Sequence, residues 1–301
     1  MNNSLIVIAG PTAIGKTNVS IQLAKKLKCE ILSADSRQFY KEMNIGTAVP
    51  SVDELNEITH HFIQHKSIHD TYTVGDFEKD AIQKLNTLFT QQKYAILVGG
   101  SGLYLDAVTN GLDHFPEVNH DLREKLISTY KNSGIESLQK QLKRVDPTYY
   151  NKVDLQNSQR ILRALEVCLS SGKPYSSFLS APRKKRPFKV LKIGITADRP
   201  IIYDRIEKRV DIMIAQGLVD EAKKLYDYRA LNALNTVGYK ELFNYFDGVW
   251  DLEFAISEIK KNTRRFAKRQ LTWFRKDDQI MWFDYEDDCI QILNYIHKKT
   301  L

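Results

Sequence analysis

Residues 5–27 read LIVIAGPTAIGKTNVSIQLAKKL, and the stretch from Gly10 to Thr17 within them spells G-x-x-x-x-G-K-T. The apolar run that precedes this motif predicts a buried β-strand. After the motif, apolar side chains recur at roughly helical spacing, which predicts a helix. A glycine loop between a strand and a helix is the setting in which this motif binds phosphate groups. We therefore expect a phosphate-binding loop at the start of an α/β fold.

The residue types of this loop suit an anionic ligand. Backbone N–H groups and the N-terminus of the following helix point at one anionic site, and glycines at positions 10 and 15 let the backbone close around it. Lys16 adds a point charge, and the hydroxyl of Thr17 is placed to bind Mg²⁺. The expected phosphate-binding residues are Gly10, Pro11, Thr12, Ala13, Ile14, Gly15, Lys16 and Thr17.

Length and composition are those of a globular protein. The chain has 301 residues, 43% of them hydrophobic, which allows one large domain or two modest ones. No apolar run approaches the ~20 residues of a membrane-spanning helix, and the N-terminus has no signal-peptide layout, so we expect a cytoplasmic protein without membrane association. Cys29, Cys168 and Cys289 follow no metal-binding spacing and are expected to be buried thiols. The net charge of +7 favours a polyanionic partner.

Strands and helices alternate along the first third of the chain. Residues 31–32 predict a short second strand, residues 77–90 a helix, and residues 94–98 a further strand that runs into a glycine turn. Such alternation is typical of a parallel, doubly wound sheet. Asp35 and Ser36 lie just past the end of the second strand, at the sheet edge where ligands bind in open α/β folds.

The pattern changes after about residue 114. Three helices are predicted at 121–134, 135–145 and 157–172, the first and last ended by Gly134 and Gly172, with almost no strand signal among them. A strand reappears at about residue 188, and long helices follow to the end. We therefore expect an α/β core, residues 1–114 and 188–301, that carries an α-helical insertion domain, residues 115–187.

An ordinary nucleotide hydrolase is disfavoured. Such an enzyme usually carries an acidic residue after a second apolar strand, where it helps to hold Mg²⁺. Here the strand at 94–98 runs into Gly99-Gly100-Ser101-Gly102 and has no acidic residue at its end. The nearest candidate is Asp35, on another turn. A small-molecule kinase with this phosphate-binding loop remains an alternative.

A strongly basic helix is predicted near the C-terminus, in EIKKNTRRFAKRQLTWFRK. Its lysines and arginines form two adjacent rows on one helical face, without an interleaved acidic residue between positions 260 and 276. Clustered basic side chains neutralise phosphates, so this face favours a nucleic acid partner. Phe266, Trp273 and Phe274 either pack beneath the charges or stack on bases. A second basic segment, residues 183–186, can extend the same surface.

Taken together, these motifs resemble the bacterial tRNA dimethylallyltransferases, also called tRNA isopentenyltransferases. The resemblance spans nearly the whole chain and follows the order of the motifs in that family. The matching segments are GPTAIGKT (10–17), DSRQFY (35–40) followed by MNIGTAVP, VGGSGLYLDA (98–107), NSQRILRALEV (157–167), NTVGYKE (235–241) and RRFAKRQLTWFRK (264–276).

The resemblance implies a reaction. These enzymes transfer a dimethylallyl group from dimethylallyl diphosphate to the exocyclic amine of the adenosine just 3′ of the anticodon, in tRNAs that read codons beginning with U. The phosphate-binding loop would then hold the diphosphate leaving group, with Mg²⁺ near Thr17. Asp35 matches the general base of the family, and Ser101 matches a hydroxyl position that the family usually fills with threonine. The helix YDRIEKRVD supplies a diphosphate-binding arginine, Arg209 as first choice and Arg205 as second.

The resemblance also implies how tRNA is bound. The helical insertion would grip the anticodon stem-loop, and the basic helix would add phosphate contacts. The expected tRNA-binding residues are Asp35, Ser36, Arg37, Gln38, Ser101, Arg123, Gln159, Arg160, Ile161, Leu162, Arg163, Arg264, Arg265 and Lys268. We expect a monomer. An adenylate isopentenyltransferase, which modifies free nucleotides, shares the core and remains an alternative, although the insertion and the basic helix favour tRNA.

Overall fold

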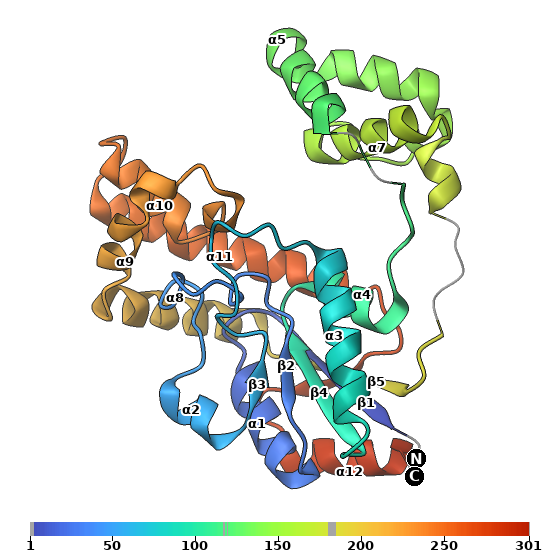
Figure 1. Cartoon of the computed structure of the whole chain (residues 1–301). Helices are drawn as coiled ribbons and strands as arrows, with labels where there is room; N and C mark the ends of the chain where they lie inside the picture. Colours follow the sequence, from blue (N-terminus) through green and yellow to red (C-terminus); the bar gives the residue numbers. More distant parts are fainter. Residues whose placement is uncertain (1–2, 117, 119, 180–184, 301) are drawn as a thin grey trace. The chain divides into compact units, whose positions relative to one another are not determined.

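The computed structural model describes residues 3–116, 118, 120–179 and 185–300. Within them, parallel strands form one six-stranded sheet of order β3-β2-β4-β1-β5-β6, with helices on both faces (Figure 1). The predicted parallel α/β fold is therefore confirmed. The strands are β1 (Ser4–Ala9), β2 (Ile31–Ser33), β3 (His60–His61), β4 (Tyr94–Gly99), β5 (Lys189–Thr196) and β6 (Met281–Asp284).

The chain divides into two compact units, residues 1–110 with 185–301 and residues 111–184. None of the described helices is long and apolar enough to cross a membrane. The helices of the larger unit are α1 (Lys16–Leu27), α2 (Val52–Glu57), α3 (Val74–Leu88), α4 (Gly102–Asn110), α8 (Arg199–Ala215), α9 (Leu218–Lys224), α10 (Tyr239–Phe246), α11 (Leu252–Phe274) and α12 (Cys289–Thr300). Those of the smaller unit are α5 (His120–Val145), α6 (Pro147–Tyr150) and α7 (Ser158–Ser171).

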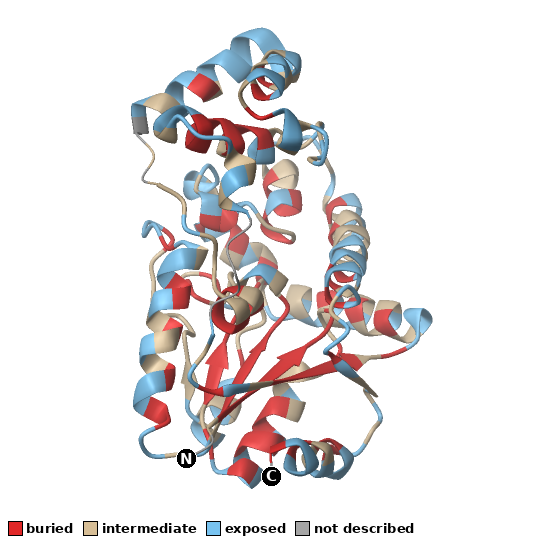
Figure 2. Ribbon diagram, turned by 90° about the vertical axis from the view of Figure 1, so that its right-hand side faces the viewer, coloured by how far each residue is buried: buried red, intermediate tan, exposed pale blue. Residues whose placement is uncertain are grey.

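The sheet is the core of the larger unit because its inner strands are buried on both faces. Side chains alternate along a strand, so Leu5 and Val7 of β1 pack into the cluster that contains the buried residues of α3, while Ile6 and Ile8 pack into the cluster that contains those of α1 and α12. In Figure 2 the inner strands are accordingly mostly buried, whereas the helices expose their outer sides. The continuous apolar runs of the sequence thus reflect two-sided burial.

The strand order brings together three loops that lie far apart in the sequence. Strand β4 lies between β1 and β2, with Ala9 opposite Gly99 and Ser33 opposite Val98. Because all three strands are parallel, the loops that follow them meet at one edge of the sheet. Gly99 permits this approach, since a Cβ atom there would lie 2.7 Å from the backbone oxygen of Ala34.

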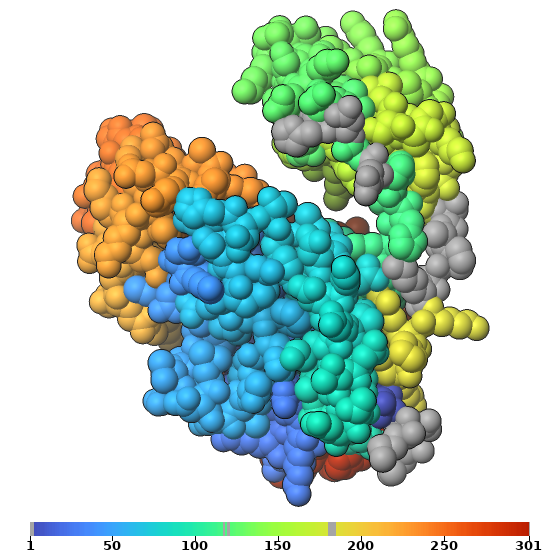
Figure 3. Space-filling model, in the orientation of Figure 1, coloured from blue at the N-terminus to red at the C-terminus, as the bar shows by residue number. Residues whose placement is uncertain are grey.

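One wall of this edge is fastened to the C-terminal half of the chain. The Glu221 carboxylate of α9 accepts hydrogen bonds from the backbone N–H groups of Ile45 (2.8 Å) and Gly46 (2.9 Å). It also accepts one from the hydroxyl of Tyr239 (2.7 Å), a fully buried side chain. In Figure 3 the α9–α10 segment, in orange, lies against the blue N-terminal segment as these contacts require. The segment MNIGT is therefore positioned by distant residues.

The C-terminal edge of the sheet differs from the sequence-based expectation, whereas the break at Gly134 agrees with it. The chain does not end in helices alone, because residues 281–284 form the edge strand β6, which pairs in parallel with β5. The strand is only partly buried, and the apolar run that includes it, residues 280–283, is too short for periodicity to distinguish a strand from a helix. The helices expected at 121–134 and 135–145 both lie within α5, and Gly134, with non-helical dihedral angles (φ 71°, ψ −179°), separates them as expected.

Candidate active site

A pocket of about 1080 Å³ opens at the carboxyl edge of β1, β2 and β4 in the larger unit. The phosphate-binding loop, the turn after β2 and the glycine turn after β4 contribute to its floor, and side chains of α8 and α11 contribute to its walls. Ligands of open α/β sheets bind at this edge, so the pocket lies where the topology predicts a binding site.

The phosphate-binding loop has the strained backbone that its glycines allow. Gly10 (φ 152°) and Gly15 (φ 105°) lie in the positive-φ region, and a Cβ atom on Gly10 would approach the Ile195 oxygen of β5 to 2.5 Å. The ammonium of Lys16 donates a hydrogen bond to the backbone oxygen of Pro11 (2.7 Å). Lys16 therefore folds over the loop, close to where a bound anion would lie.

The two arginines of α8 occupy different positions. Arg205 donates from Nε to the backbone oxygen of Ala13 (2.8 Å), and its guanidinium lies over the ring of Tyr285. Arg209 lines the pocket and forms no hydrogen bond or ion pair with the described residues. Burial lowers the pKa of Arg209, an effect that the nearby Asp35 carboxylate opposes. Arg205 thus supports the loop, and Arg209 is available to a ligand.

Asp35 lies on a tight turn directly after β2. No helix follows it, so it is not a helix N-cap; its Oδ1 instead accepts a hydrogen bond from the backbone N–H of Arg37 (3.0 Å). Desolvation lowers the pKa of Lys16 to about 8, while the Asp35 charge opposes the shift and Arg209 reinforces it. One carboxylate and two cations therefore share a single electrostatic environment in the pocket.

The serine of the glycine turn meets the turn after β2. The Oγ atom of Ser101 accepts a hydrogen bond from the backbone N–H of Ser36 (3.3 Å) and lies 3.3 Å from its Oγ. Since both residues line the pocket, the structure brings two of the predicted site residues into contact with each other and beside Asp35.

Arg37 and Gln38, both predicted to contact tRNA, are engaged within the protein. The Arg37 guanidinium donates to the backbone oxygens of Asn232 (2.9 Å) and Ala233 (3.0 Å). The Gln38 amide donates to the oxygen of Ala48 (2.9 Å) and accepts from the hydroxyl of Ser33 (3.1 Å). Both side chains fasten the turn that carries Asp35 to neighbouring loops.

Sequence reasoning missed one important residue, Gln270 of α11. Its Oε1 accepts a hydrogen bond from the backbone N–H of Thr12 (2.8 Å), and its Nε2 donates to the oxygen of Gly100 (2.9 Å). The side chain is buried, and a Cβ atom on Gly100 would lie 2.2 Å from its Nε2. One amide therefore joins the phosphate-binding loop to the glycine turn. Its only sequence signal was an uncharged polar residue within a basic helix.

We expect Gln270→Leu to loosen this junction. The substitution leaves a partly buried N–H group and a buried carbonyl without partners, which should lower the free energy of unfolding by ~2 kcal/mol. It should also weaken binding of inorganic diphosphate, measured by calorimetry, because Thr12 belongs to the loop. Thr272→Ala, an exposed change on the same helix, serves as the control. Unchanged stability and unchanged diphosphate affinity would contradict the assigned role.

The basic helix α11 is partly neutralised by α8. Lys260 pairs with Asp211 (2.6 Å) and Arg264 with Glu207 (2.6 Å), so these two cations hold the helices together. Arg265 and Lys268 are exposed and form no ion pair with the described residues. Arg264, expected to bind tRNA, is thus engaged in an ion pair that the sequence pattern did not reveal, because its acidic partner comes from another helix.

The second basic segment is engaged within the protein at Arg186, whereas Lys185 is exposed. Arg183 and Lys184 lie outside the described residues. Arg186 pairs with Glu78 (2.8 Å) and donates to the backbone oxygens of Ala107 and Val108, with only 10% of its side chain exposed. It is a structural cation and does not extend the basic surface.

The predicted tRNA-binding residues of the smaller unit fall into two groups. Ile161 and Leu162 are buried in the core of this unit, and the contact of their segment with tRNA stays a prediction. The guanidinium groups of Arg123 and Arg163 flank the buried carboxylate of Glu166, at 2.7 and 3.5 Å, and remain partly exposed. Gln159 and Arg160 are exposed on the first turn of α7.

A magnesium ion would find few protein ligands here. Among the described residues, no group of three His, Cys, Asp or Glu side chains is arranged to hold a metal. The hydroxyl of Thr17 lines the pocket beside Lys16. One hydroxyl suits Mg²⁺, which usually keeps several waters and takes other ligands from substrate phosphates. The site therefore fits a metal that arrives with a phosphorylated substrate.

Comparisons with known proteins agree on one family. The family model described as IPP transferase matches residues 38–277. The tRNA dimethylallyltransferases of Christiangramia forsetii and Flavobacterium johnsoniae are 60% and 57% identical to this chain, over 99% and 97% of it and 99% and 96% of their own lengths.

Solved structures give the same result. The tRNA isopentenylpyrophosphate transferase of Bacillus halodurans is 37% identical, with a TM-score of 0.75 over 100% of this chain and 97% of its own. A eukaryotic dimethylallyltransferase solved acting on tRNA is 27% identical, with a TM-score of 0.82 over 95% of this chain and 74% of its own.

Proposed function

Because the chain belongs to the IPP transferase family, we propose that its pocket transfers a dimethylallyl group from dimethylallyl diphosphate to the exocyclic amine of an adenosine in tRNA. The enzyme is a tRNA dimethylallyltransferase by its relatives, which favours this reaction over a kinase or an adenylate isopentenyltransferase. The adenosine would be the one 3′-adjacent to the anticodon in tRNAs that read codons beginning with U. The observation that carries the proposal is the single pocket that Asp35, Lys16 and Arg209 line together.

The cations of the pocket suit the leaving group. When the allylic carbon–oxygen bond breaks, negative charge grows on the oxygens of diphosphate. Lys16, Arg209 and the N–H groups of the loop are preorganised to stabilise that charge. Gln270 already occupies the N–H of Thr12, so the other loop N–H groups are the available donors. Arg205 acts indirectly, by holding the loop oxygen of Ala13.

We further propose that Mg²⁺ enters with the diphosphate and is held by the hydroxyl of Thr17. When bound, the ion supplies additional positive charge for the departing diphosphate. The phosphate-binding loop, Lys16 and Arg209 would orient the donor so that its reactive carbon faces the turn after β2.

Asp35 is proposed as the base. The lone pair of the adenine amine forms the new bond to the allylic carbon while the bond to diphosphate breaks, and one N–H proton must then leave the nitrogen. The carboxylate of Asp35 accepts this proton. Its Oδ1 accepts the hydrogen bond of its turn, whereas Oδ2 accepts none from the described residues and is available to the amine. The hydroxyls of Ser101 and Ser36 lie beside it and can contact the target nucleotide.

The smaller unit is proposed to bind the anticodon stem-loop as part of a monomeric, cytoplasmic enzyme. Arg123 and Arg163 both pair with the buried carboxylate of Glu166. This pairing fixes the two guanidinium groups for phosphate contacts. Gln159 and Arg160 lie exposed on the same helix as Arg163. The target nucleobase must leave the anticodon-loop stack before its amine can reach the Asp35 carboxylate inside the pocket.

The direct test uses purified enzyme, unmodified tRNA and dimethylallyl diphosphate. Mass spectrometry of the digested tRNA should reveal isopentenyladenosine next to the anticodon, together with release of diphosphate. Replacement of tRNA by adenosine monophosphate tests the alternative acceptor, and labelled ATP tests a kinase. Modified free nucleotide, or a phosphorylated product without prenylation, would overturn the proposal.

Salt dependence tests the basic helix. We expect Arg265→Ala with Lys268→Ala to weaken tRNA binding and to flatten the dependence of log affinity on log salt. Removal of one cation that neutralises a phosphate should reduce the slope by ~0.7–0.9. Arg264→Gln is the matched control, because its charge already pairs with Glu207 and should leave the slope nearly unchanged. An unchanged slope in the double variant would show that this face does not contact tRNA.

A further inference from the structure

Resting on the proposed function, we propose that Trp273 is a stacking surface for a nucleobase of the acceptor tRNA at the mouth of the pocket. The residue follows Gln270 by one turn of α11, lines the pocket and exposes 42% of its surface. Its neighbour Phe274 is 3% exposed and belongs to the core. Of two adjacent aromatic residues, one therefore anchors the helix and the other is presented to the pocket.

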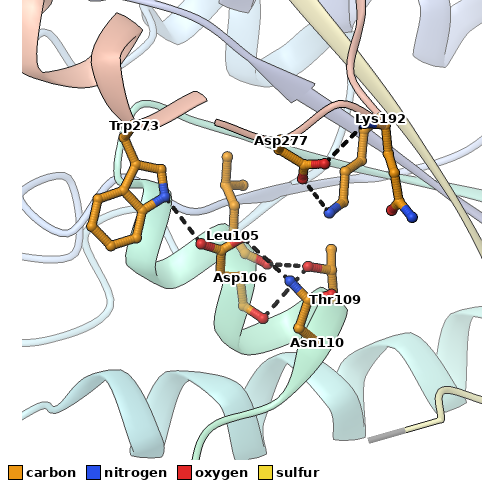
Figure 4. Close-up of polar contacts among 8 residues, drawn as sticks. Leu105, Asp106, Thr109, Asn110, Lys192, Trp273 and Asp277 are labelled. Carbon is orange, nitrogen blue, oxygen red and sulfur yellow. Dashed lines mark hydrogen bonds and ion pairs between the residues drawn. The ribbon is translucent and has the colours of Figure 1, made fainter. Parts of the chain in front are cut away.

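The indole ring is held in a fixed orientation. Its Nε1–H donates a hydrogen bond to Oδ2 of Asp106 on α4 (3.0 Å), as Figure 4 shows. Asp106 also accepts a hydrogen bond from the amide of Asn110 (3.4 Å), which links it to the end of the same helix. The single polar group of the indole is thus satisfied within the protein. What remains of its exposed surface is the apolar ring.

One side of the ring packs against Gly102. A Cβ atom at this glycine would lie 2.3 Å from Cδ1 and 2.4 Å from Nε1 of Trp273, so a larger residue would displace the indole. Gly102 directly follows Ser101, whose hydroxyl contacts Ser36 on the turn that carries Asp35. The ring therefore packs against the residue next to Ser101, whose hydroxyl is proposed to contact the target nucleotide.

A nucleobase is the ligand that suits this surface. Every base has a π-face, and bases withdrawn from a stack regain stacking energy on exposed aromatic rings. The exposed side chain of Arg269 also lines the pocket and can neutralise the phosphates next to the stacked base. Its guanidinium lies over the ring of Phe266, which is 38% exposed. The competing occupant is the dimethylallyl chain of the donor, which needs an apolar wall but no neighbouring cation.

The experiment combines fluorescence with kinetics. The chain has three tryptophans, so binding of an anticodon stem-loop RNA with the target adenosine can be followed by quenching of their emission. We expect this quenching to be largely lost in Trp273→Leu and retained in Trp250→Phe, a tryptophan outside the pocket. Affinity for the stem-loop should fall on the order of 10- to 100-fold in Trp273→Leu, the usual effect of losing one base–aromatic stack.

Further readouts separate stacking from a purely structural role. The salt dependence of binding should keep the parent slope, because no charge is removed. The KM for dimethylallyl diphosphate should stay at the parent value, and Trp273→Phe, which keeps an aromatic face, should recover most of the affinity. Parent affinity for the stem-loop in folded Trp273→Leu, or a raised KM for the donor alone, would overturn the inference. Failure of the proposed function is distinguishable, because the parent enzyme would then not prenylate tRNA.

Discussion

Asp35→Asn should bind both substrates and transfer the dimethylallyl group ~10²–10⁴ times more slowly than the parent, the usual contribution of a positioned general base. The asparagine keeps the size of the side chain, and its oxygen can still accept the hydrogen bond from Arg37 that closes the turn. It cannot accept a proton at neutral pH. The measurement is single-turnover transfer with both substrates saturating.

The turn supplies the competing explanation and the control. If Asp35 only stabilises the turn after β2, Asn should replace it with little loss, because both side chains form such turns. Asp76→Asn, a capping carboxylate at the start of α3 outside the pocket, is the matched change and should not slow the transfer. Near-parental turnover of Asp35→Asn, with an unchanged melting temperature, would remove Asp35 from the chemistry.

Lys16→Ala should lower turnover by ~10²–10³, corresponding to ~3 kcal/mol of lost stabilisation of the departing diphosphate. The ammonium is close enough to the loop to donate to the oxygen of Pro11, and the Asp35 charge acts on it within the same pocket. Lys25→Ala on the same helix is the control, because that side chain is exposed and pairs with Glu57. Transfer at the parental rate by Lys16→Ala would remove the loop from the mechanism.

The pH profile gives an independent check on Lys16. Desolvation lowers its pKa to about 8, so the free enzyme loses the positive charge as pH rises through that value. The kcat/KM for dimethylallyl diphosphate, which reports the free enzyme, should therefore fall above pH about 8. Lys16→Met has no group to titrate and should lack this limb. A parental profile in Lys16→Met would assign the limb to another residue.

Much of the fold could be predicted from local patterns. The inner strands β1 and β4 are apolar runs, β5 is an apolar segment interrupted by Lys192, and the motif at residues 10–17 identifies a strand, a loop and a helix at once. Strands β3 and β6 escaped prediction because they are edge strands, two and four residues long and only partly buried. Such segments owe their conformation to pairing with a neighbouring strand, which no local pattern records.

The amino-acid sequence by itself determined the phosphate-binding loop, the class of the fold and, through the series of motifs, the family, because each of these depends on residues close together in the chain. Only the tertiary structure decided which side chains are available. Arg264 meets Glu207 across 57 positions and Gln270 meets Thr12 across 258. Trp273 and Phe274 are adjacent, yet one faces the pocket and the other the core. Charge pairing and burial depend on which elements pack together, and that packing minimises the free energy of the whole chain rather than of any segment.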